Sequence, residues 1–253
     1  MNFVSFEFLV FLPLVFLVYW GILRSSLRLQ NLFLVIVSYI FYGWWDWRFL
    51  SLIVFSSLVD FACGQKINQT ATAKTRKTFL ILSLTTNLGI LAVFKYFNFF
   101  IDSFGEMLLS LGVQANLPSL NIILPVGISF YTFQTLSYTI DVYKGKLEAS
   151  DDWVAFFAYV AFFPQLVAGP IERATHLLPQ FSEQRKFDYS QAFSGIRQAI
   201  WGFFKKVAIA DNCALMVDEI FRGSDELSSS VLILGAVYFA CLLYTSPSPR
   251  DRG

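Results

Sequence analysis

Long apolar runs, separated by short polar stretches, recur along this chain. They cover residues 8–23, 32–45, 49–63, 78–94, 122–145, 153–168 and 229–244. A helix that crosses a hydrocarbon core about 30 Å thick needs roughly 20 mostly apolar residues, and several of these runs approach that length. We therefore predict an all-α fold: a polytopic transmembrane helical bundle.

Composition supports the same class. The 253 residues are 56% hydrophobic and only 15% charged, they include 29 Phe, and the mean hydropathy is +0.57. This is more apolar surface than one globular core of this length can bury, so the lipid bilayer is the expected partner. The net charge of +1 and the scattered basic residues argue against a nucleic-acid partner.

The loop charges predict an orientation. Lys and Arg gather after the first run, at Arg24 and Arg28, and after the third, in a basic loop at 64–77, and such loops stay in the cytoplasm. The tryptophan-rich turn at 44–48 then lies on the other side, and the N-terminus is extracytoplasmic. Asp60 stands near the end of the third run, where we expect an interfacial, solvated carboxylate rather than a functional buried one.

The central run, 122–145, is apolar yet carries hydrogen-bonding side chains through its length. Each of them needs a partner at membrane depth, so we expect a helix that faces protein or a wet cavity. A single Ser or Thr can bond back to the carbonyl one turn earlier, whereas Gln134 does this less easily. The polar residues are Ser129, Thr132, Gln134, Thr135, Ser137 and Thr139.

Three further segments depart from a simple span. Pro164 and the Gly169-Pro170 pair interrupt the sixth run, so we predict a broken or re-entrant segment at 162–173, because prolines remove backbone hydrogen bonds. Residues 95–120 mix aromatics and charges, which predicts a segment along the membrane surface. Residues 194–217 alternate apolar and polar positions, which predicts an interfacial amphipathic helix.

Composition and spacing alone assemble no catalytic constellation. The one histidine, His176, follows the broken segment without a neighbour that would position it as an acid or base, and we expect it to be solvated. Cys63, Cys213 and Cys241 are far apart and lack companion histidines, so we predict neither a metal site nor a disulfide and expect small buried side chains. No bound cofactor is predicted.

Four ordered motifs resemble the membrane-bound O-acyltransferase family, in its alginate O-acetyltransferase branch. They are LPVGISFYTFQ at 124–134, DVYKG at 141–145, FFPQLVAGPI at 162–171 and KKVAIAD at 205–211. The resemblance implies a multi-pass enzyme of the bacterial plasma (inner) membrane that moves an acetyl group to a hydroxyl of an exported polysaccharide such as alginate, cellulose or peptidoglycan. It implies acetyl-CoA or an acyl carrier as donor, and periplasmic or membrane partners of an acetylation system.

The resemblance also implies roles for polar residues. Gln134, Tyr138, Asp141, Gln165 and Arg173 would line the path of the acyl donor or acceptor. Arg173 would meet a phosphate or carboxylate, although pairing with Glu172 or with a lipid headgroup is an alternative. The catalytic histidine of the family is expected beyond the end of this chain, so no catalytic residue is assigned here. A transporter or polysaccharide-export partner stays open as the other function, because broken helices with polar groups at depth also form transport paths.

The domain prediction divides the chain at its last apolar run. We expect residues 1–240 to form an incomplete N-terminal part of a membrane-bound O-acyltransferase domain. Two prolines and three charges follow the run and stop a lipid-facing helix. Residues 241–253 resemble the translation of a sequencing adaptor, and we expect a non-native tail there.

Overall fold

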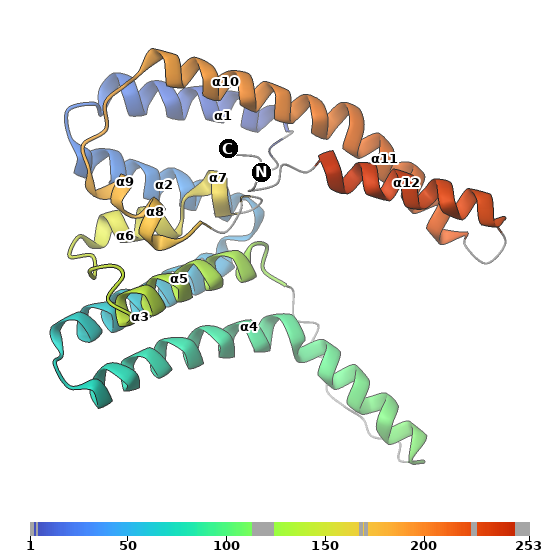
Figure 1. The fold of residues 1–253 in the computed structure, drawn as a ribbon, viewed down its shortest axis with the longest axis horizontal. Coiled ribbons are helices and arrows are strands. Elements are labelled where there is room, and N and C mark those ends of the chain that lie inside the picture. Colours follow the sequence, from blue (N-terminus) through green and yellow to red (C-terminus); the bar gives the residue numbers. More distant parts are fainter. Residues whose placement is uncertain are drawn as a thin grey trace. The chain divides into compact units, whose positions relative to one another are not determined.

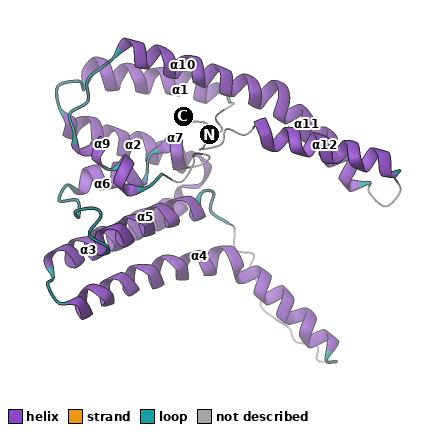
Figure 2. Ribbon diagram, in the orientation of Figure 1, coloured by secondary structure: helices purple, strands orange, loops and turns teal. Residues whose placement is uncertain are grey.

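The computed structural model describes residues 3, 5–112, 124–166, 169, 172–223 and 227–245. These residues form helices and connecting turns, with no strand among them, so the predicted all-α class is confirmed (Figures 1 and 2). The chain divides into two units. One holds Leu14–Arg185, and the other holds Asn2–Pro13 together with Lys186–Gly253.

The first helices of the chain are longer than the apolar runs that predict them. They are α1 (Phe6–Leu17), the π-helix η1 (Val18–Ile22), α2 (Leu27–Asp46), the 3-10 turn η2 (Trp47–Phe49) and α3 (Leu50–Gln69). The predicted basic loop at 64–77 is wrong, because α3 continues through it to Gln69 and only residues 70–72 separate α3 from the next helix. Ile67 within that stretch is fully buried, so packing extends the helix past the apolar run.

Helix α4 (Ala73–Ser110) runs unbroken for 38 residues. The predicted end of the fourth run at residue 94 is therefore wrong, since the helix continues without a proline through residues 95–110. Their position along a membrane surface stays a prediction, and residues 113–120 lie outside the described residues. At 1.5 Å per residue α4 is roughly 57 Å long, which exceeds a hydrocarbon core of about 30 Å. Figure 1 shows that α4 bends along its length.

Two stretches are long and apolar enough to cross a membrane by length and composition. They are Leu27–Gln69, which holds α2 and α3, and Ala73–Ser110. Shorter apolar helices lie at Phe6–Ile22, Trp153–Leu166 and Ser229–Tyr244.

Helix α5 (Ile128–Tyr143) is the central helix that the polar run predicts. It packs against α3 and α4, which also pack against each other. Thr132, Gln134, Thr135 and Thr139 are all buried, so the prediction of a helix that faces protein is confirmed. Short helices follow: α6 (Trp153–Val160), which packs on α2 and α3, then α7 (Phe163–Leu166), α8 (Ala174–Leu177) and α9 (Pro179–Ser182).

The second unit is built from one long helical stretch and its partner. Helix α10 (Tyr189–Phe204) continues into the π-helix η3 (Lys205–Ala210) and α11 (Asp211–Arg222). Helix α12 (Ser229–Thr245) packs against α11 and η3. Gly235 permits this packing, because a Cβ at that position would lie 2.7 Å from Ile220 Cγ2. Of the predicted tail at 241–253, residues 241–245 continue α12, and residues 246–253 lie outside the described residues.

Candidate functional site

The turn before α5 joins three parts of the first unit. Gly127 has φ +77, and a Cβ at this residue would lie 2.6 Å from the backbone oxygen of Leu166. The hydroxyl of Tyr42 donates a hydrogen bond of 2.8 Å to the carbonyl of Val126. The motif at 124–127 therefore brings the start of α5 against α7 and α2, and glycine is the residue that both the left-handed backbone and the close approach require.

Gln134 joins α5 to α6 through a reciprocal pair of hydrogen bonds. Its Nε2 donates to the carbonyl of Tyr159 at 2.8 Å, and the Tyr159 hydroxyl donates to the Gln134 carbonyl at 3.1 Å. Gln134 is 2% exposed and Tyr159 is fully buried. Satisfied hydrogen bonds of this kind fix the position of one helix along the other, because little water is present there to replace them.

Tyr138 lies one turn further along the same helix and is fully buried. Its ring centroid is 4.6 Å from that of Phe156, and its hydroxyl accepts a bond of 3.1 Å from the backbone N–H of Ser150. A Cβ on Gly64 would come within 2.7 Å of the Tyr138 ring and hydroxyl. The absence of a side chain at Gly64 is therefore what admits the ring between α3 and α6.

Asp141 lies near the end of α5 and is partly exposed. Its carbonyl accepts the backbone N–H of Lys146 at 2.9 Å, which closes the turn after the helix. Arg76, from the start of α4, donates to the carbonyl of Tyr143 at 2.9 Å. The end of α5, two residues after Asp141, is thus bonded to a basic residue of α4.

The predicted break in the sixth run is confirmed in the described residues. Helix α6 ends at Val160, four residues before Pro164, where the proline ring would meet the carbonyl of a continued helix. The N–H of Phe163, freed by the break, donates to Ser38 Oγ at 3.2 Å. Gln165 is 8% exposed, and the Gly169 N–H donates to its carbonyl at 3.0 Å.

Arg173 and His176 lie beyond the break. Arg173 is exposed and immediately precedes α8, a short helix that packs against α5. His176 is also exposed, as the sequence predicts, and its carbonyl accepts Gln180 Nε2 at 3.2 Å. The structure thus places α5 and the segment after the break side by side, with Gln134, Tyr138 and Gln165 buried and with Asp141 and Arg173 open to solvent to different degrees.

The interpretation of Asp60 as a solvated interfacial residue is wrong. Asp60 is fully buried, and its carboxylate accepts hydrogen bonds from Ser83 and Asn87 of α4. The sequence places Asp60 close to a basic stretch, but α3 continues as a helix past this point, so that Asp60 lies within the packed part of the helix. The interpretation of the cysteines as buried residues holds for Cys63 alone, since Cys213 is half-buried and Cys241 is exposed.

The sequence analysis does not predict a cluster of side chains around Arg185. Arg185 donates to Asn31 Oδ1 at 2.9 Å, and its guanidinium lies 5.0 Å from the Phe181 ring and 5.7 Å from the Tyr19 ring. Asn31 in turn donates to the Phe181 carbonyl at 2.7 Å. The cluster fastens the segment after α9 to η1 and α2. Tyr19 and Asn31 are at least 150 residues from Phe181 and Arg185 in the chain, so no local pattern indicates the cluster.

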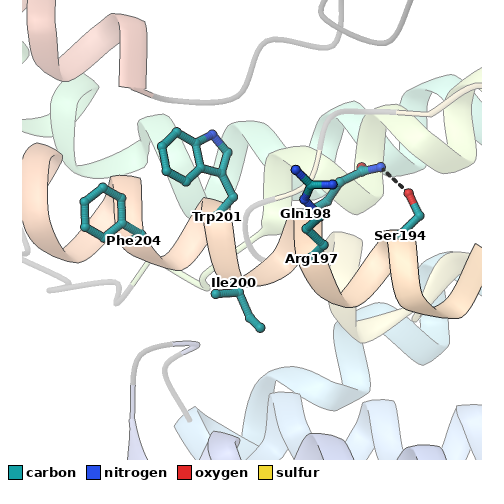
Figure 3. A pocket seen from close by; sticks show the side chains of 6 residues that line it. All are labelled: Ser194, Arg197, Gln198, Ile200, Trp201 and Phe204. Atoms are coloured by element: carbon teal, nitrogen blue, oxygen red, sulfur yellow. Dashed lines mark hydrogen bonds between the residues drawn. The ribbon is translucent and has the colours of Figure 1, made fainter.

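A hollow lies along α10 in the second unit. Figure 3 shows its six lining side chains, all from this helix, with Gln198 Nε2 bonded to Ser194 Oγ at 3.3 Å. The other four are Arg197, Ile200, Trp201 and Phe204. Apolar and polar groups share this exposed surface, in keeping with the amphipathic helix that the sequence predicts. Among the described residues, no group of three or more His, Cys, Asp and Glu could hold a metal ion.

Comparison with known proteins gives matches over nearly the whole chain. It is 38% identical over 237 residues to the probable alginate O-acetylase AlgI of Pseudomonas aeruginosa, which is 93% of this chain and 44% of that protein. It is 37% identical over 236 residues to the protein of the same name from Azotobacter vinelandii, covering 93% and 46%. It is 32% identical over 263 residues to the peptidoglycan O-acetyltransferase of Helicobacter pylori, covering 92% and 49%.

The helices and these matches together indicate the class, a helical protein with candidate membrane spans that is similar to proteins named O-acetyltransferases. Within that class, the similarity confirms the resemblance to the alginate O-acetyltransferase branch of the membrane-bound O-acyltransferases. The chain spans less than half the length of the curated relatives it matches. No family model matches the chain, and no solved structure matches it significantly.

Proposed function

We propose that this chain is part of an integral-membrane O-acyltransferase that acetylates hydroxyl groups of an exported polysaccharide. The observation that carries the proposal is the 38% identity to an alginate O-acetylase over 93% of the chain. The names of the relatives give two acceptors, alginate and peptidoglycan, and both are hydroxyl-bearing polymers. The matches do not favour a transporter without acyl-transfer chemistry.

Acyl transfer to a hydroxyl needs a donor, a base within hydrogen-bond reach of the hydroxyl, and a route that brings the two substrates together. Acetyl-CoA or an acyl carrier would serve as the donor. We assign the catalytic base to the histidine motif of the family, which residues 1–253 do not contain, and give no catalytic role to His176. Residues 1–240 would form part of the acyltransferase domain, and residues 241–253 would have no biological role.

The route would run along α5 and the segment after the break. In this proposal Gln134, Tyr138 and Gln165 shape its wall from buried positions, and the first two also fix the position of α5 along α6 and α3. Asp141 and Arg173 are the more exposed of the five residues and would contact substrate. The guanidinium of Arg173 would bind a phosphate of the donor or a carboxylate of the acceptor through paired hydrogen bonds.

The protein would lie in the bacterial inner membrane as a multi-pass protein with its N-terminus outside the cytoplasm. Support for this comes from the apolar helices and from the basic residues on both sides of the η1–α2 and α3–α4 connections, since such residues stay in the cytoplasm. The polysaccharide would then be acetylated on the extracytoplasmic side, together with periplasmic or membrane partners of the same acetylation system.

The test is complementation with the intact protein that carries this sequence. A strain that lacks its own polysaccharide O-acetylase receives the wild type, Arg173→Ala or Arg173→Lys, and the O-acetyl content of the purified polymer is measured beside the amount of protein in membranes. We expect the wild type to restore acetylation and Arg173→Ala to lower its rate about 10- to 100-fold, as for the loss of a hydrogen-bonded charge.

Arg222→Ala is the matched control, because Arg222 is equally an exposed arginine but belongs to the second unit, in the last turn of α11, and has no part in the proposed route. It should acetylate like the wild type. If the wild type is present in membranes and restores no acetyl groups to any polymer tested, the proposed function is wrong. If Arg173→Ala and Arg222→Ala both acetylate normally, only the assignment of Arg173 is wrong.

A further inference from the structure

The carboxylate of Asp60 lies at the centre of a polar cluster where α3, α4 and α5 meet. Ser83 Oγ donates to Asp60 Oδ1 at 2.5 Å, and Asn87 Nδ2 lies 2.9 Å from each carboxylate oxygen. Thr139 Oγ1, from α5, is 3.2 Å from Ser83 Oγ and 3.5 Å from Asp60 Oδ1. Asp60, Ser83 and Thr139 are fully buried, so this one carboxylate joins three helices.

Asn87 is itself held in one orientation. Its Oδ1 accepts Ser56 Oγ from α3 at 2.5 Å, while its Nδ2 also lies 3.0 Å from the carbonyl of Ser83. The amide therefore presents its N–H groups to Asp60 and its oxygen to Ser56. A hydrogen bond network in which each donor faces an acceptor is intolerant of a shift of one helix along another.

Neutral donors, and no described basic side chain, bond to this carboxylate. The ion pairs between described residues, Arg48–Asp46 and Lys206–Asp211, do not include Asp60. An apolar side chain at residue 60 would join the helices without desolvating a charge, and such replacements are often neutral or stabilising. What an apolar contact does not supply is a fixed register, which a buried polar group can specify.

The register matters for α5, because its path residues lie on the same interface. Thr139 and Tyr138 are adjacent in the chain, and Tyr138 occupies the space above Gly64, one turn beyond Asp60 on α3. If α5 slid or turned, Thr139 would leave Ser83 and the Tyr138 ring would leave Gly64 together. One turn earlier on α5, Gln134 would lose its bonds to Tyr159.

We propose that Asp60 is a positioning residue, which fixes the placement of α5 against α3 and α4 and thereby sets the wall of the acyl-transfer route. The inference rests on the proposed function for its consequence in catalysis. Its first part, the placement of α5, stands on the hydrogen bonds alone. Asp60 itself contacts no substrate in this scheme.

The experiment exchanges the two partners of the central hydrogen bonds. Asp60→Asn leaves two amides face to face, and Asn87→Asp leaves two carboxylates, whereas the double exchange restores one carboxylate beside one amide. Cys63 serves as a built-in probe, because it lies three residues from Asp60 on α3 and is 3% exposed. Chain 1–253 in lipid nanodiscs, with Cys213→Ser and Cys241→Ser, is labelled with a maleimide.

We expect each single variant to speed the labelling of Cys63 about 10- to 100-fold, as hydrogen bonds to a charged group are lost. The double exchange should return the rate to within about threefold of the parent, since coupled partners show non-additive effects. Ser57→Ala is the matched control, because the buried Ser57 hydroxyl donates only to the Ile53 carbonyl of its own helix, at 2.7 Å. Its labelling rate should stay at the parent value.

The same exchanges are then made in the intact protein, where acetylation is measured against polymer concentration. We expect kcat to fall about 10- to 100-fold in the single variants with KM little changed, because misplacement by about 1 Å has effects of this size, and to recover in the double exchange. Unchanged labelling in the single variants overturns the placement of α5 by Asp60. Faster labelling with unchanged kcat overturns the role in catalysis. If the intact wild type acetylates nothing, the proposed function fails, while the labelling of chain 1–253 still decides the placement of α5.

Discussion

Replacing Gly127 by alanine tests the close approach between the turn before α5 and the segment after the break. The left-handed backbone of Gly127, φ +77, costs a residue with a Cβ about 1–2 kcal/mol. The new methyl would also lie 2.6 Å from the Leu166 oxygen, a backbone atom that cannot rotate away, and such overpacking costs about 1–3 kcal/mol. We therefore expect Gly127→Ala to lower the free energy of unfolding by about 2–5 kcal/mol in total.

Gly145→Ala is the matched control for this substitution. Gly145 has φ +70, but nothing lies within 4 Å of a Cβ built there, so only the backbone cost of about 1–2 kcal/mol applies. The difference between the two variants, about 1–3 kcal/mol, corresponds to a Tm roughly 2–12 °C lower for Gly127→Ala. Thermal unfolding of the purified chain in detergent micelles, followed by circular dichroism, measures it. Equal Tm values for the two variants would refute the close approach to Leu166.

Two further predictions concern the end of the first unit and the start of the second. Arg185→Lys keeps the positive charge but removes the planar guanidinium that lies over the Tyr19 and Phe181 rings. Thermal unfolding should show a free energy of unfolding lower by about 1–2 kcal/mol. Bonds from the backbone N–H of Gln191, and from Ser190, hold the pKa of the Asp188 carboxyl below its ordinary value. The stabilisation of the α10 N-terminus is therefore complete above the ordinary pKa of about 3.9 and is lost as the pH falls through the lower folded value. Amide exchange at Gln191 should quicken over that range and should not change with pH in Asp188→Ala, once the intrinsic pH dependence of exchange is subtracted; a parallel response of both proteins would contradict the cap.

Local chemistry made part of this fold predictable. Pro164 forbids a continued helix whatever surrounds it, so the break after α6 follows from the sequence. Gln134 needs a partner at membrane depth, and that need predicted a helix among other helices without indicating that the partner is the Tyr159 carbonyl. Helix ends were less accessible, because Ile67 extends α3 by packing rather than by hydrophobic run length.

Asp60 shows what a single chain position cannot reveal. Its neighbours in sequence suggested an interface, whereas its environment is made by Ser83 and Asn87, which are 23 and 27 residues away, and by Thr139, which is 79 residues away. Arg185 is the same case over a longer separation. Predicting either would require knowing which helix faces are paired, and a pattern along one chain does not contain that information.

The π-helical turn η3 has a consequence for how the long helix of the second unit can be used. A turn closed by i→i+5 hydrogen bonds accommodates roughly one residue more than an α-turn, and each added residue rotates everything after it by about 100°. The side chains of α11 are thereby out of phase with those of α10, although the backbone continues from one to the other. One continuous helical stretch thus presents side chains in two different directions. The face of α11 packs against α12, while the face of α10 that carries Trp201 points in another direction. One additional residue in the π-turn is enough to create this difference.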